Sequence, residues 1–555
     1  ILLDASDNEI DRVEWDNGST FPDPDGASMI FIGTPDEDNN DGLLWATSSI
    51  VTGLDSDSGS PGANGLEQFI TNTSIYESGA WSAGVPSGAT GTTNFIVMDG
   101  TYAPTSDIDI QSLQVRSGAS FEMGYTLNAG GSIFNMGSFL FQSDATSDGE
   151  LGPLVENAQV TGDFTVEQYF SNNRSYRMVS PAVTTSTSIY DNWQEGGAEI
   201  ANYGTDITGG DSADGFDQTT TNNPSIFEVD YSATPAPAFV ALPNTNAINL
   251  DTDDSYLLFV RGDRMIDLTN NSSSSSTTLR ATGTLATGPQ SQSYGVADEE
   301  FAMFGNPYQS SIDLGLVLDG NPAILTDFFY LFDPNKGDNG DYVMVDYTTG
   351  ANSDGSTANQ YLQPGQAAQV QAGLPVDNVL TIDFDESDKS PGNHTDVRAL
   401  DEDAMDISFK LYTSESFKIE RVYDAFKISF ANDFSNEINR RDGVKPGNFG
   451  ENFGTINGEG KFGYERRAMP VENEVIQLSS TNYQHTDYVL TINVPEGLEN
   501  AVFIDDYTST ETILKTGENQ IEFSVGDEAS KAENRFSIAF TNSLSVDTQD
   551  FMGVN

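Results

Sequence analysis

Phe95-Ile-Val-Met98 is the first of a series of short segments between Thr93 and Phe170 that alternate apolar and small polar residues. Glycine or asparagine interrupts the series, whose other members are Ile108-Asp-Ile-Gln-Ser-Leu-Gln-Val115, Phe121-Glu-Met-Gly-Tyr-Thr-Leu127, Ile133-Phe-Asn-Met136, Phe139-Leu-Phe141 and Val160 to Phe170. Alternation with a period of about two residues indicates half-buried β-strands, because successive side chains of a strand point to opposite faces. Such strands gain stability by stacking on their neighbours. We therefore expect a β-solenoid-like ladder over residues 66–170 that acts as a rigid spacer.

The chain is strongly acidic. Its 555 residues include 85 Asp and Glu against 23 Lys and Arg, which gives a formal net charge of -62. Proteins bind phosphate backbones and anionic lipid surfaces through clustered Lys and Arg, so no nucleic-acid partner is expected. Such a charge suits a salty or calcium-containing exterior that screens the repulsion. The length predicts roughly three or four domains.

Cysteine is absent, which excludes a disulfide framework, a thiolate nucleophile and a cysteine-type zinc site. No run of about eighteen apolar residues is present, so direct membrane insertion is not expected. The sequence begins Ile1-Leu-Leu-Asp4 without a starting Met. We therefore expect it to be a piece of a longer protein.

Residues 1–65 contain short strand-like segments with a distinctive order of turns and aromatic residues. This order comprises Asp11 and Trp15, the turn Phe21-Pro-Asp-Pro-Asp-Gly26, Ser28, Trp45, and Ser60-Pro-Gly-Ala-Asn64. It resembles the second half of the bacterial lamin-tail domain. The resemblance implies a partial immunoglobulin-like β-sandwich whose first strands are missing from the chain.

Two further regions are rich in strand-like segments. Residues 171–392 contain short segments broken by Gly, Pro and Asn, which predicts a β-rich, sandwich-like domain. Within it, the serine-rich stretch 269–278 is predicted to be a hairpin loop. Residues 393–546 alternate cleanly and predict an antiparallel β-sandwich, followed by a linker over residues 547–555. The fold class is therefore all-β and multidomain.

A second resemblance covers most of the chain, from about residue 66 to residue 546. Its motifs are Arg174-Ser-Tyr-Arg177, Ile189-Tyr-Asp-Asn-Trp-Gln-Glu-Gly-Gly197, Gly305-Asn-Pro-Tyr-Gln-Ser310, Gln363-Pro-Gly-Gln-Ala367, Asp505-Asp-Tyr-Thr-Ser-Thr510 and Arg535-Phe-Ser-Ile-Ala-Phe540. Together they resemble the C-terminal region of large cell-surface proteins that the type IX secretion system of Bacteroidota exports. The resemblance implies that a cleaved sorting domain follows. It also implies that the secretion translocon and attachment machinery are partners and that the protein is extracellular, attached to the outer cell surface.

The best candidate metal loop is Asp333-Pro-Asn-Lys-Gly-Asp-Asn-Gly-Asp341, because calcium takes several oxygen ligands on a tight turn. Its candidate ligands are Asp333, Asn335, Asp338 and Asp341. The loop is not an EF-hand, since Gly337 and Asp338 depart from that pattern. Strand-like residues on both sides make an ordinary hairpin turn the simpler interpretation. A second acidic set could also bind calcium or be plain turns: Asp23, Asp25, Asp36, Asp38 and Asp41.

Two short motifs are better explained by structure than by function. Arg261-Gly-Asp263 matches an adhesion tripeptide, but the apolar residues around it favour a strand, a turn and another strand. Gly458-Glu-Gly-Lys-Phe-Gly463 has the spacing of a dinucleotide loop. It lacks the following helix that a Rossmann fingerprint needs.

Catalytic motifs are scarce. The only histidines are His394 and His485, and neither a Gly-x-Ser-x-Gly elbow nor a His-Glu-x-x-His helix is present. A pair of carboxylates, which is all that a glycosidase needs, stays open among so many acids. The paired cations Arg440-Arg441 and Arg466-Arg467 are expected to pair with acids across the sandwich, or else to form a docking patch.

We therefore expect a non-catalytic surface region that displays an upstream functional part, whose own activity the sequence leaves open. Two alternatives remain. The aromatic-rich region 171–392 could make the chain an adhesin that binds extracellular glycans. The lamin-tail resemblance could instead make it the accessory half of a secreted nuclease, since such domains often accompany nucleases.

Overall fold

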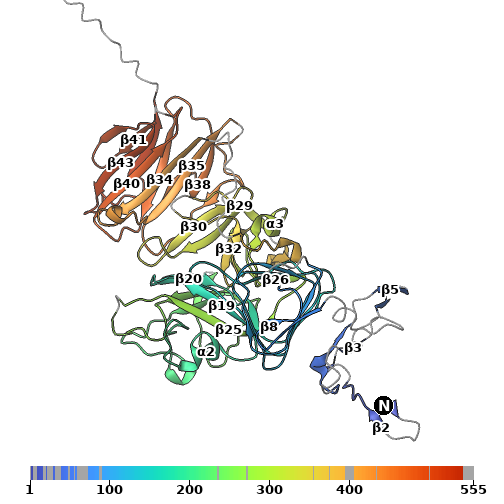
Figure 1. The fold of residues 1–555 in the computed structure, drawn as a ribbon. Coiled ribbons are helices and arrows are strands. Elements are labelled where there is room, and N and C mark those ends of the chain that lie inside the picture. The colour runs from blue at the N-terminus through green and yellow to red at the C-terminus, as the bar shows by residue number, and fades with distance from the viewer. Residues whose placement is uncertain are drawn as a thin grey trace, which may run out of the picture.

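The computed structural model confirms an all-β, multidomain chain (Figure 1). It describes residues 73–86, 91–233, 237–270, 273–353, 356–373, 376–393, 405–432, 434–498 and 501–541, with short pieces between residues 2 and 58. Those pieces form antiparallel pairs of very short strands: β1 (Leu2–Leu3) with β2 (Glu9–Asp11), β3 (Met29–Phe31) with β4 (Trp45–Thr47), and β5 (Val51–Leu54) with β6 (Asp57–Ser58). Much of the expected lamin-tail-like sandwich lies outside the described residues.

The ladder is a three-faced parallel β-solenoid. One face contains β9 (Asn94–Val97), β12 (Ser112–Val115), β15 (Ile133–Asn135) and β18 (Val160–Thr161), extended by β7 (Thr73–Glu77) and β8 (Ala80–Trp81). The second contains β10 (Thr101–Tyr102), β13 (Ser120–Met123), β16 (Ser138–Phe141) and β19 (Phe164–Phe170). The third contains β11 (Ile108–Ile110), β14 (Thr126–Ala129) and β17 (Glu150–Leu151). Successive coils stack in parallel register, which explains the repeated apolar pattern.

An aromatic stack fills the interior of the solenoid. Phe121 and Phe139 pair across adjacent coils with ring centroids 4.9 Å apart, and Phe139 contacts Phe164 at 5.0 Å. All three side chains are buried. Such pairs add about 0.5–1.5 kcal/mol beyond the area that they bury. Each coil therefore depends on its neighbours for its core.

The sheet that contains β19 continues beyond the solenoid. Strand β19 pairs antiparallel along its whole length with β25 (Thr277–Leu285), which also pairs with β21 (Val183–Thr185). A single hydrophobic core runs from Phe95 in the solenoid to Ala281 in the next region. The solenoid and the region that follows it therefore share one core.

The middle region contains two small sheets and two strand pairs. One sheet has the order β20 (Ser175–Val179), β24 (Tyr256–Val260), β22 (Ile226–Asp230), β23 (Ala238–Ala241). The other has the order β27 (Phe301–Gly305), β32 (Ala367–Ala372), β29 (Ile324–Asp333), β30 (Asp341–Asp346). The pairs are β26 (Gln290–Tyr294) with β33 (Leu380–Phe384), and β28 (Ile312–Asp313) with β31 (Tyr361–Leu362).

Helices are few and short in the part of the chain that the structure describes. They are α2 (Ile189–Asn192), α3 (Leu314–Leu318) and the 3-10 turns η1 (Gly42–Leu44), η2 (Glu195–Gly197), η3 (Ser212–Asp214), η4 (Val376–Asn378), η5 (Glu386–Asp388) and η6 (Ser416–Ile419). A capping box formed by Ser188 and Asp191 begins α2, because the Ser188 hydroxyl and the Asp191 carboxylate accept each other's backbone N–H groups.

Residues 405–540 fold into one continuous, strongly curved sheet. Its order is β42 (Thr510–Ile513), β41 (Ala501–Asp505), β44 (Phe536–Phe540), β39 (Val475–Thr481), β37 (Asn452–Asn457), β38 (Gly460–Ala468), β35 (Asp424–Ala431), β34 (Met405–Thr413), β40 (Asp487–Val494), β43 (Gly517–Ser524), with β36 (Gly443–Val444) beside β38. The edge strands β42 and β43 are consecutive in the chain, so the sheet bends back on itself as a half-barrel. Its inner face holds an aromatic core around Phe426, Phe453 and Phe536.

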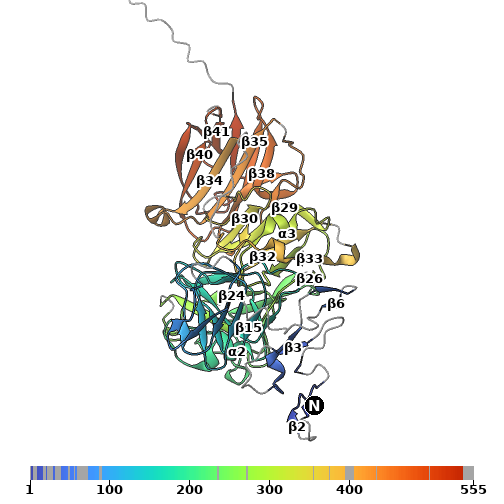
Figure 2. The same cartoon turned by 45° about the vertical axis from the view of Figure 1, so that its right-hand side comes forward.

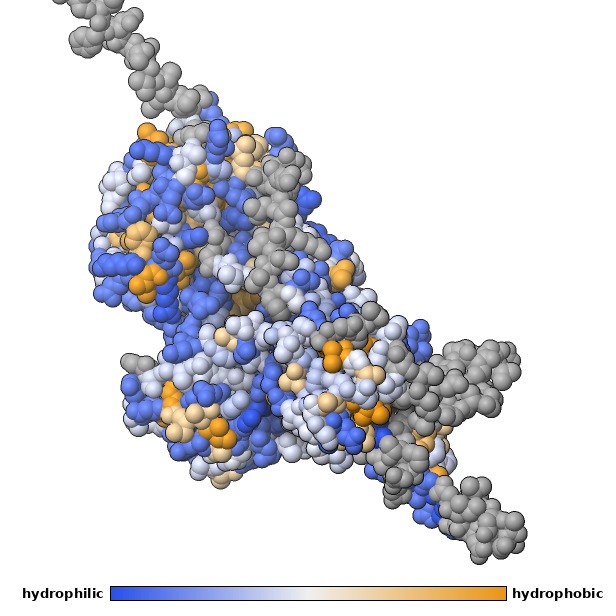
Figure 3. Space-filling view, viewed as in Figure 1, coloured by the Kyte–Doolittle hydropathy of each residue, from blue (hydrophilic) through white to orange (hydrophobic). Residues whose placement is uncertain are grey.

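The regions follow one another in space as they do in sequence. Figures 1 and 2 show the solenoid and the strands around β24 at one end, the β29–β32 sheet in the middle and the half-barrel at the other end. The visible face in Figure 3 is mostly hydrophilic, with scattered apolar side chains. This surface agrees with the acidic composition.

Candidate binding site

A pocket of about 470 Å³ lies where the solenoid meets the middle region. Its walls come from four parts of the chain: the loop 143–148 between β16 and β17, the ends of β19 and β20, the end of β29, and residues 356–367 around β31. Ligand sites typically have volumes of about 300–1,000 Å³. The size is therefore sufficient for a small molecule or one unit of a polymer.

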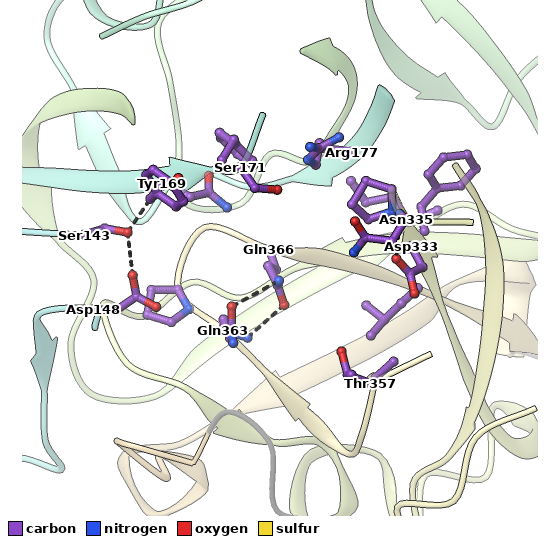
Figure 4. Close-up of a pocket in the computed structure, with 18 of the residues that line it drawn as sticks. Ser143, Asp148, Tyr169, Ser171, Arg177, Asp333, Asn335, Thr357, Gln363 and Gln366 are labelled. Carbon is purple, nitrogen blue, oxygen red and sulfur yellow. Dashed lines mark hydrogen bonds between the residues drawn. The ribbon is translucent and has the colours of Figure 1, made fainter. Parts of the chain in front are cut away.

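The turn at Gln363 to Gln366 is fixed against two strands that line the pocket. The Gly365 carbonyl accepts hydrogen bonds from the Gln168 amide on β19, at 2.8 Å, and from the Ser180 backbone N–H, at 2.9 Å. The amides of Gln363 and Gln366 bond to each other at 3.3 Å. Figure 4 shows this pair between Ser143, Asp148 and Tyr169 on one side and Arg177, Asp333 and Asn335 on the other.

Arg177 is the unusual residue of the pocket. Its side chain is buried, and its guanidinium donates to two backbone carbonyls, those of Tyr176 at 3.3 Å and Asn173 at 3.0 Å. The guanidinium also lies over the Phe170 ring, 5.4 Å from its centroid. Burial lowers the pKa of Arg177 to about 10, although the Asp333 charge acts in the opposite direction. Arg177 forms no ion pair with a carboxylate in the part of the chain that the structure describes.

Several other buried cations among the described residues have carboxylate partners. Such ion pairs are formed by Arg264, Arg466, Arg535, Lys389, Lys427 and Lys445. Buried Arg261 resembles Arg177 instead, because its guanidinium donates to the Asp206 carbonyl and the Thr208 hydroxyl. A buried charge without a close counter-charge is costly. Arg177 therefore lacks the close counter-charge that these ion-paired cations have, and it lines a cavity.

The remaining polar groups of the pocket are held by local hydrogen bonds. The Asp333 carboxylate accepts from the Asn335 backbone N–H at 2.8 Å and from the Ser356 hydroxyl at 2.6 Å. On the opposite wall, the Ser143 hydroxyl donates to Asp148 and accepts from the Tyr169 backbone N–H at 2.8 Å. The pocket thus offers carboxylate and amide oxygens together with one guanidinium.

The structure places the four candidate calcium ligands in a hairpin turn, since Asp333 and Asp341 are paired across β29 and β30. Their side chains have separate partners. Asp333 bonds to Ser356, Asn335 accepts from the Asn173 amide at 3.2 Å, and Asp338 accepts from the Tyr423 hydroxyl at 2.6 Å. No group of three His, Cys, Asp or Glu side chains among the described residues is arranged to hold a metal ion. Calcium at this loop stays a prediction.

Asp341 belongs to a buried charge cluster. Burial and the nearby Asp424 carboxylate raise the pKa of Asp341 to about 8, while Lys336 and Lys445 oppose this effect. Burial also lowers the pKa of Lys336, whose ammonium group has no hydrogen-bond partner among the described residues. The cluster joins the β29–β30 hairpin to the half-barrel, so Asp341 contributes to that junction.

The remaining acidic and basic candidates have structural surroundings. Of the second acidic set, Asp23, Asp25, Asp36 and Asp38 lie outside the described residues, as does His394. The other histidine, His485, contacts Glu451 at 3.0 Å. The paired arginines do contact acids: Arg467 pairs with Glu465 and Glu474 within the half-barrel. Arg440 binds Asp327 and Arg466 binds Asp346 across the domain junction.

The two short motifs also have structural roles. Arg261 and Asp263 are buried, and Asp263 accepts a hydrogen bond from the Asn202 backbone N–H at 2.7 Å. The predicted strand before the tripeptide exists as β24, but a turn follows it instead of a second strand. Gly458 to Gly463 forms the tight turn after β37 and the first residues of β38.

Sequence reasoning did not identify Arg177 as a functional residue, although a signal exists. Residues 168–190 contain no Asp or Glu, in a chain where acids are otherwise frequent, and they include both Arg174 and Arg177. A local absence of counter-charge around an arginine could have marked the site.

The chain matches no family model, no curated protein and no solved structure. Among the described residues, no helix is long and apolar enough to cross a membrane. The assignment of function therefore depends on the geometry and on the resemblances in the sequence.

Proposed function

We propose that this chain is a non-catalytic display region of a type IX secretion cargo, exported and attached to the outer cell surface. In this proposal it holds an upstream functional part away from the cell and leads into a cleaved sorting signal. The observation that supports it best is the extensive contact between the described residues of the solenoid, the middle region and the half-barrel.

The first junction is a continuous sheet and core. Strand β19 of the solenoid pairs with β25 over seven residue pairs, from Phe164 with Gly283 to Phe170 with Thr277. Bending at this point would break both the backbone hydrogen bonds and the shared core. The solenoid and the strands around β25 should therefore move as one body.

The second junction combines aromatic packing with buried charge pairs. Tyr464 of β38 packs on Phe328 of β29 with ring centroids 5.2 Å apart. Phe449 of the half-barrel region stacks on Tyr176 at 5.1 Å and contacts Phe332 at 5.9 Å. The Gly337 backbone N–H donates to the Val422 carbonyl at 3.0 Å. These contacts favour a fixed angle between the two regions.

The adhesin alternative has one specific observation in its favour, namely the polar pocket with Arg177. A display region can also carry a binding site. The two functions are therefore compatible in one chain.

Rigidity can be measured directly because the chain has no cysteine. Ser106→Cys in the solenoid and Thr512→Cys in the half-barrel provide two exposed labelling sites for single-molecule energy transfer. We expect one narrow distance distribution, as narrow as that of a control pair within the half-barrel, Glu415→Cys with Thr512→Cys. A broad or two-peaked distribution for the long pair would contradict a rigid display region.

Export needs a separate test. The full-length precursor should reach the cell surface in a Bacteroidota host that has the type IX translocon and stay inside a host that lacks it. Protease treatment of intact cells, followed by immunoblotting, measures this difference. Equal surface exposure in both hosts would refute the secretion assignment.

A further inference from the structure

We propose that the pocket around Arg177 binds a sugar that carries a single carboxylate, such as a uronic acid unit of an extracellular glycan. This goes beyond the display function and does not depend on it. The proposal is based on the Arg177 guanidinium, which has no ion-pair partner among the described residues, on the cavity that it lines and on the polar groups of the facing wall.

The first step concerns the carboxylate. A guanidinium has five N–H donors in a planar fork, and the protein accepts two hydrogen bonds from Arg177. The unused N–H groups match the geometry of a carboxylate, which takes two parallel hydrogen bonds from arginine. A bound carboxylate would therefore supply the counter-charge that Arg177 lacks.

The second step concerns the sugar. Lining residues across the pocket from Arg177 present oxygen acceptors and amide donors, including Asp148, Gln363 and Gln366, with Asp333 and Asn335 beside Arg177. Sugar hydroxyls both donate and accept hydrogen bonds, so they suit such a mixed lining. Tyr169 and Tyr361 add flat apolar surface for the ring.

The third step concerns how many negative charges the ligand can carry. Asp144, Asp148 and Asp333 also line the pocket, and the chain as a whole carries a net charge of -62. These charges repel a polyanion at distances beyond the direct contact with Arg177. One carboxylate per bound unit is therefore favoured over sulfated or phosphorylated glycans.

The test uses the full chain and three probes: D-galacturonate, its neutral counterpart D-galactose, and a highly sulfated heparin oligosaccharide. Binding is measured by saturation-transfer NMR and titration calorimetry. We expect galacturonate to bind roughly tenfold or more tightly than galactose, as charged hydrogen bonds allow, and the sulfated oligosaccharide to bind no better than galactose. Equal binding of the two monosaccharides, binding of neither, or preference for the sulfated probe would each overturn the proposal.

Two arginine variants form a matched comparison. Arg177→Gln should remove the preference for galacturonate. Arg174→Gln changes a neighbouring arginine that also forms no ion pair with the described residues but is not among those that line the pocket, so it should keep the preference. A preference that survives Arg177→Gln would refute the role of Arg177.

A third variant decides the outcome if Arg177→Gln fails to fold. Ser171, which Figure 4 labels, is exposed and lines the pocket. A tryptophan at this position, Ser171→Trp, can therefore fill the cavity without disturbing a core. We expect Ser171→Trp to have the same melting temperature as the wild type and to lose galacturonate binding. Retained binding with an unchanged affinity would place the site elsewhere and overturn the proposal.

Discussion

The guanidinium of Arg466 on β38 forms an ion pair with the carboxylate of Asp346 at the end of β30, and both side chains are buried. This pair joins the half-barrel to the middle region at the point where Tyr464 packs on Phe328. Its burial means that solvent screens it little, whereas loss of one partner leaves an unpaired charge in the interior. It is therefore a sensitive position for testing how firmly the two regions are joined.

Arg466→Met should destabilise the protein by about 3–5 kcal/mol, because Asp346 stays buried without its counter-charge. Arg440→Met is the control. Arg440 also pairs with an acid of the middle region, Asp327, but its side chain is 52% exposed, so the expected cost is below about 1 kcal/mol. Urea unfolding monitored by circular dichroism measures the free energy of unfolding of both variants. Equal losses in the two variants would show that the Arg466 pair does not stabilise the junction.

Stability should fall as pH rises through neutrality because of Asp206. Burial and the nearby Asp217 carboxylate raise the pKa of Asp206 to about 7, against the opposing effect of Arg264 and Arg261. In the unfolded chain the pKa returns to about 3.8, so the folded protein holds a proton that the unfolded chain has lost. The resulting stabilisation is complete below pH about 4 and is lost as pH rises through about 7.

Asp206→Asn tests this because the amide cannot ionise. The urea midpoint of the wild-type chain should drop between pH 5 and pH 8, and the variant should show a smaller drop. Asp267→Asn changes an exposed aspartate on the surface and should leave the wild-type drop in place. An identical pH dependence in the wild type and Asp206→Asn would contradict the raised pKa.

The sequence predicts the strands of the solenoid because their information is local. Each coil repeats buried apolar positions, such as Leu113 and Ile133, that stack directly on one another. Pairings between strands that lie far apart in the chain could not be predicted in this way. Residues 269–278 were expected to form a hairpin loop, yet β24 before them pairs with β20 and β22, and β25 after them pairs with β19.

This difference has a physical cause. Both β24 and β25 alternate in the same way, and alternation defines which face is buried but not which neighbour is hydrogen-bonded. The choice depends on the open edge of the solenoid at β19, which needs a partner to satisfy its backbone groups. The walls of the Arg177 pocket could not be predicted for a similar reason, since they come from residues near 143, 177, 333 and 363.

Salt should stabilise the protein. The net charge of -62 makes the acidic surface repel itself, and this repulsion weakens the folded state. The Debye length falls from about 10 Å at 0.1 M to about 3 Å at 1 M salt, so sodium chloride should screen it. Buried pairs such as Arg535 with Asp505 lose little over this range. We expect the melting temperature to rise between these concentrations in differential scanning calorimetry, and a fall would mean that exposed ion pairs dominate instead.

Because the solenoid coils stack closely, some of their glycines leave no room for a side chain. A Cβ atom at Gly149 would lie 2.0 Å from the Met123 carbonyl oxygen of the preceding coil, whereas one at Gly124 would meet the flexible Gln142 side chain at 3.4 Å. Gly149→Ala should therefore cost roughly 1–3 kcal/mol or more, because backbone must shift to admit the methyl group. Gly124→Ala should be nearly neutral. Thermal unfolding of both variants checks this, and similar melting temperatures would show that the coils can separate at Gly149 without penalty.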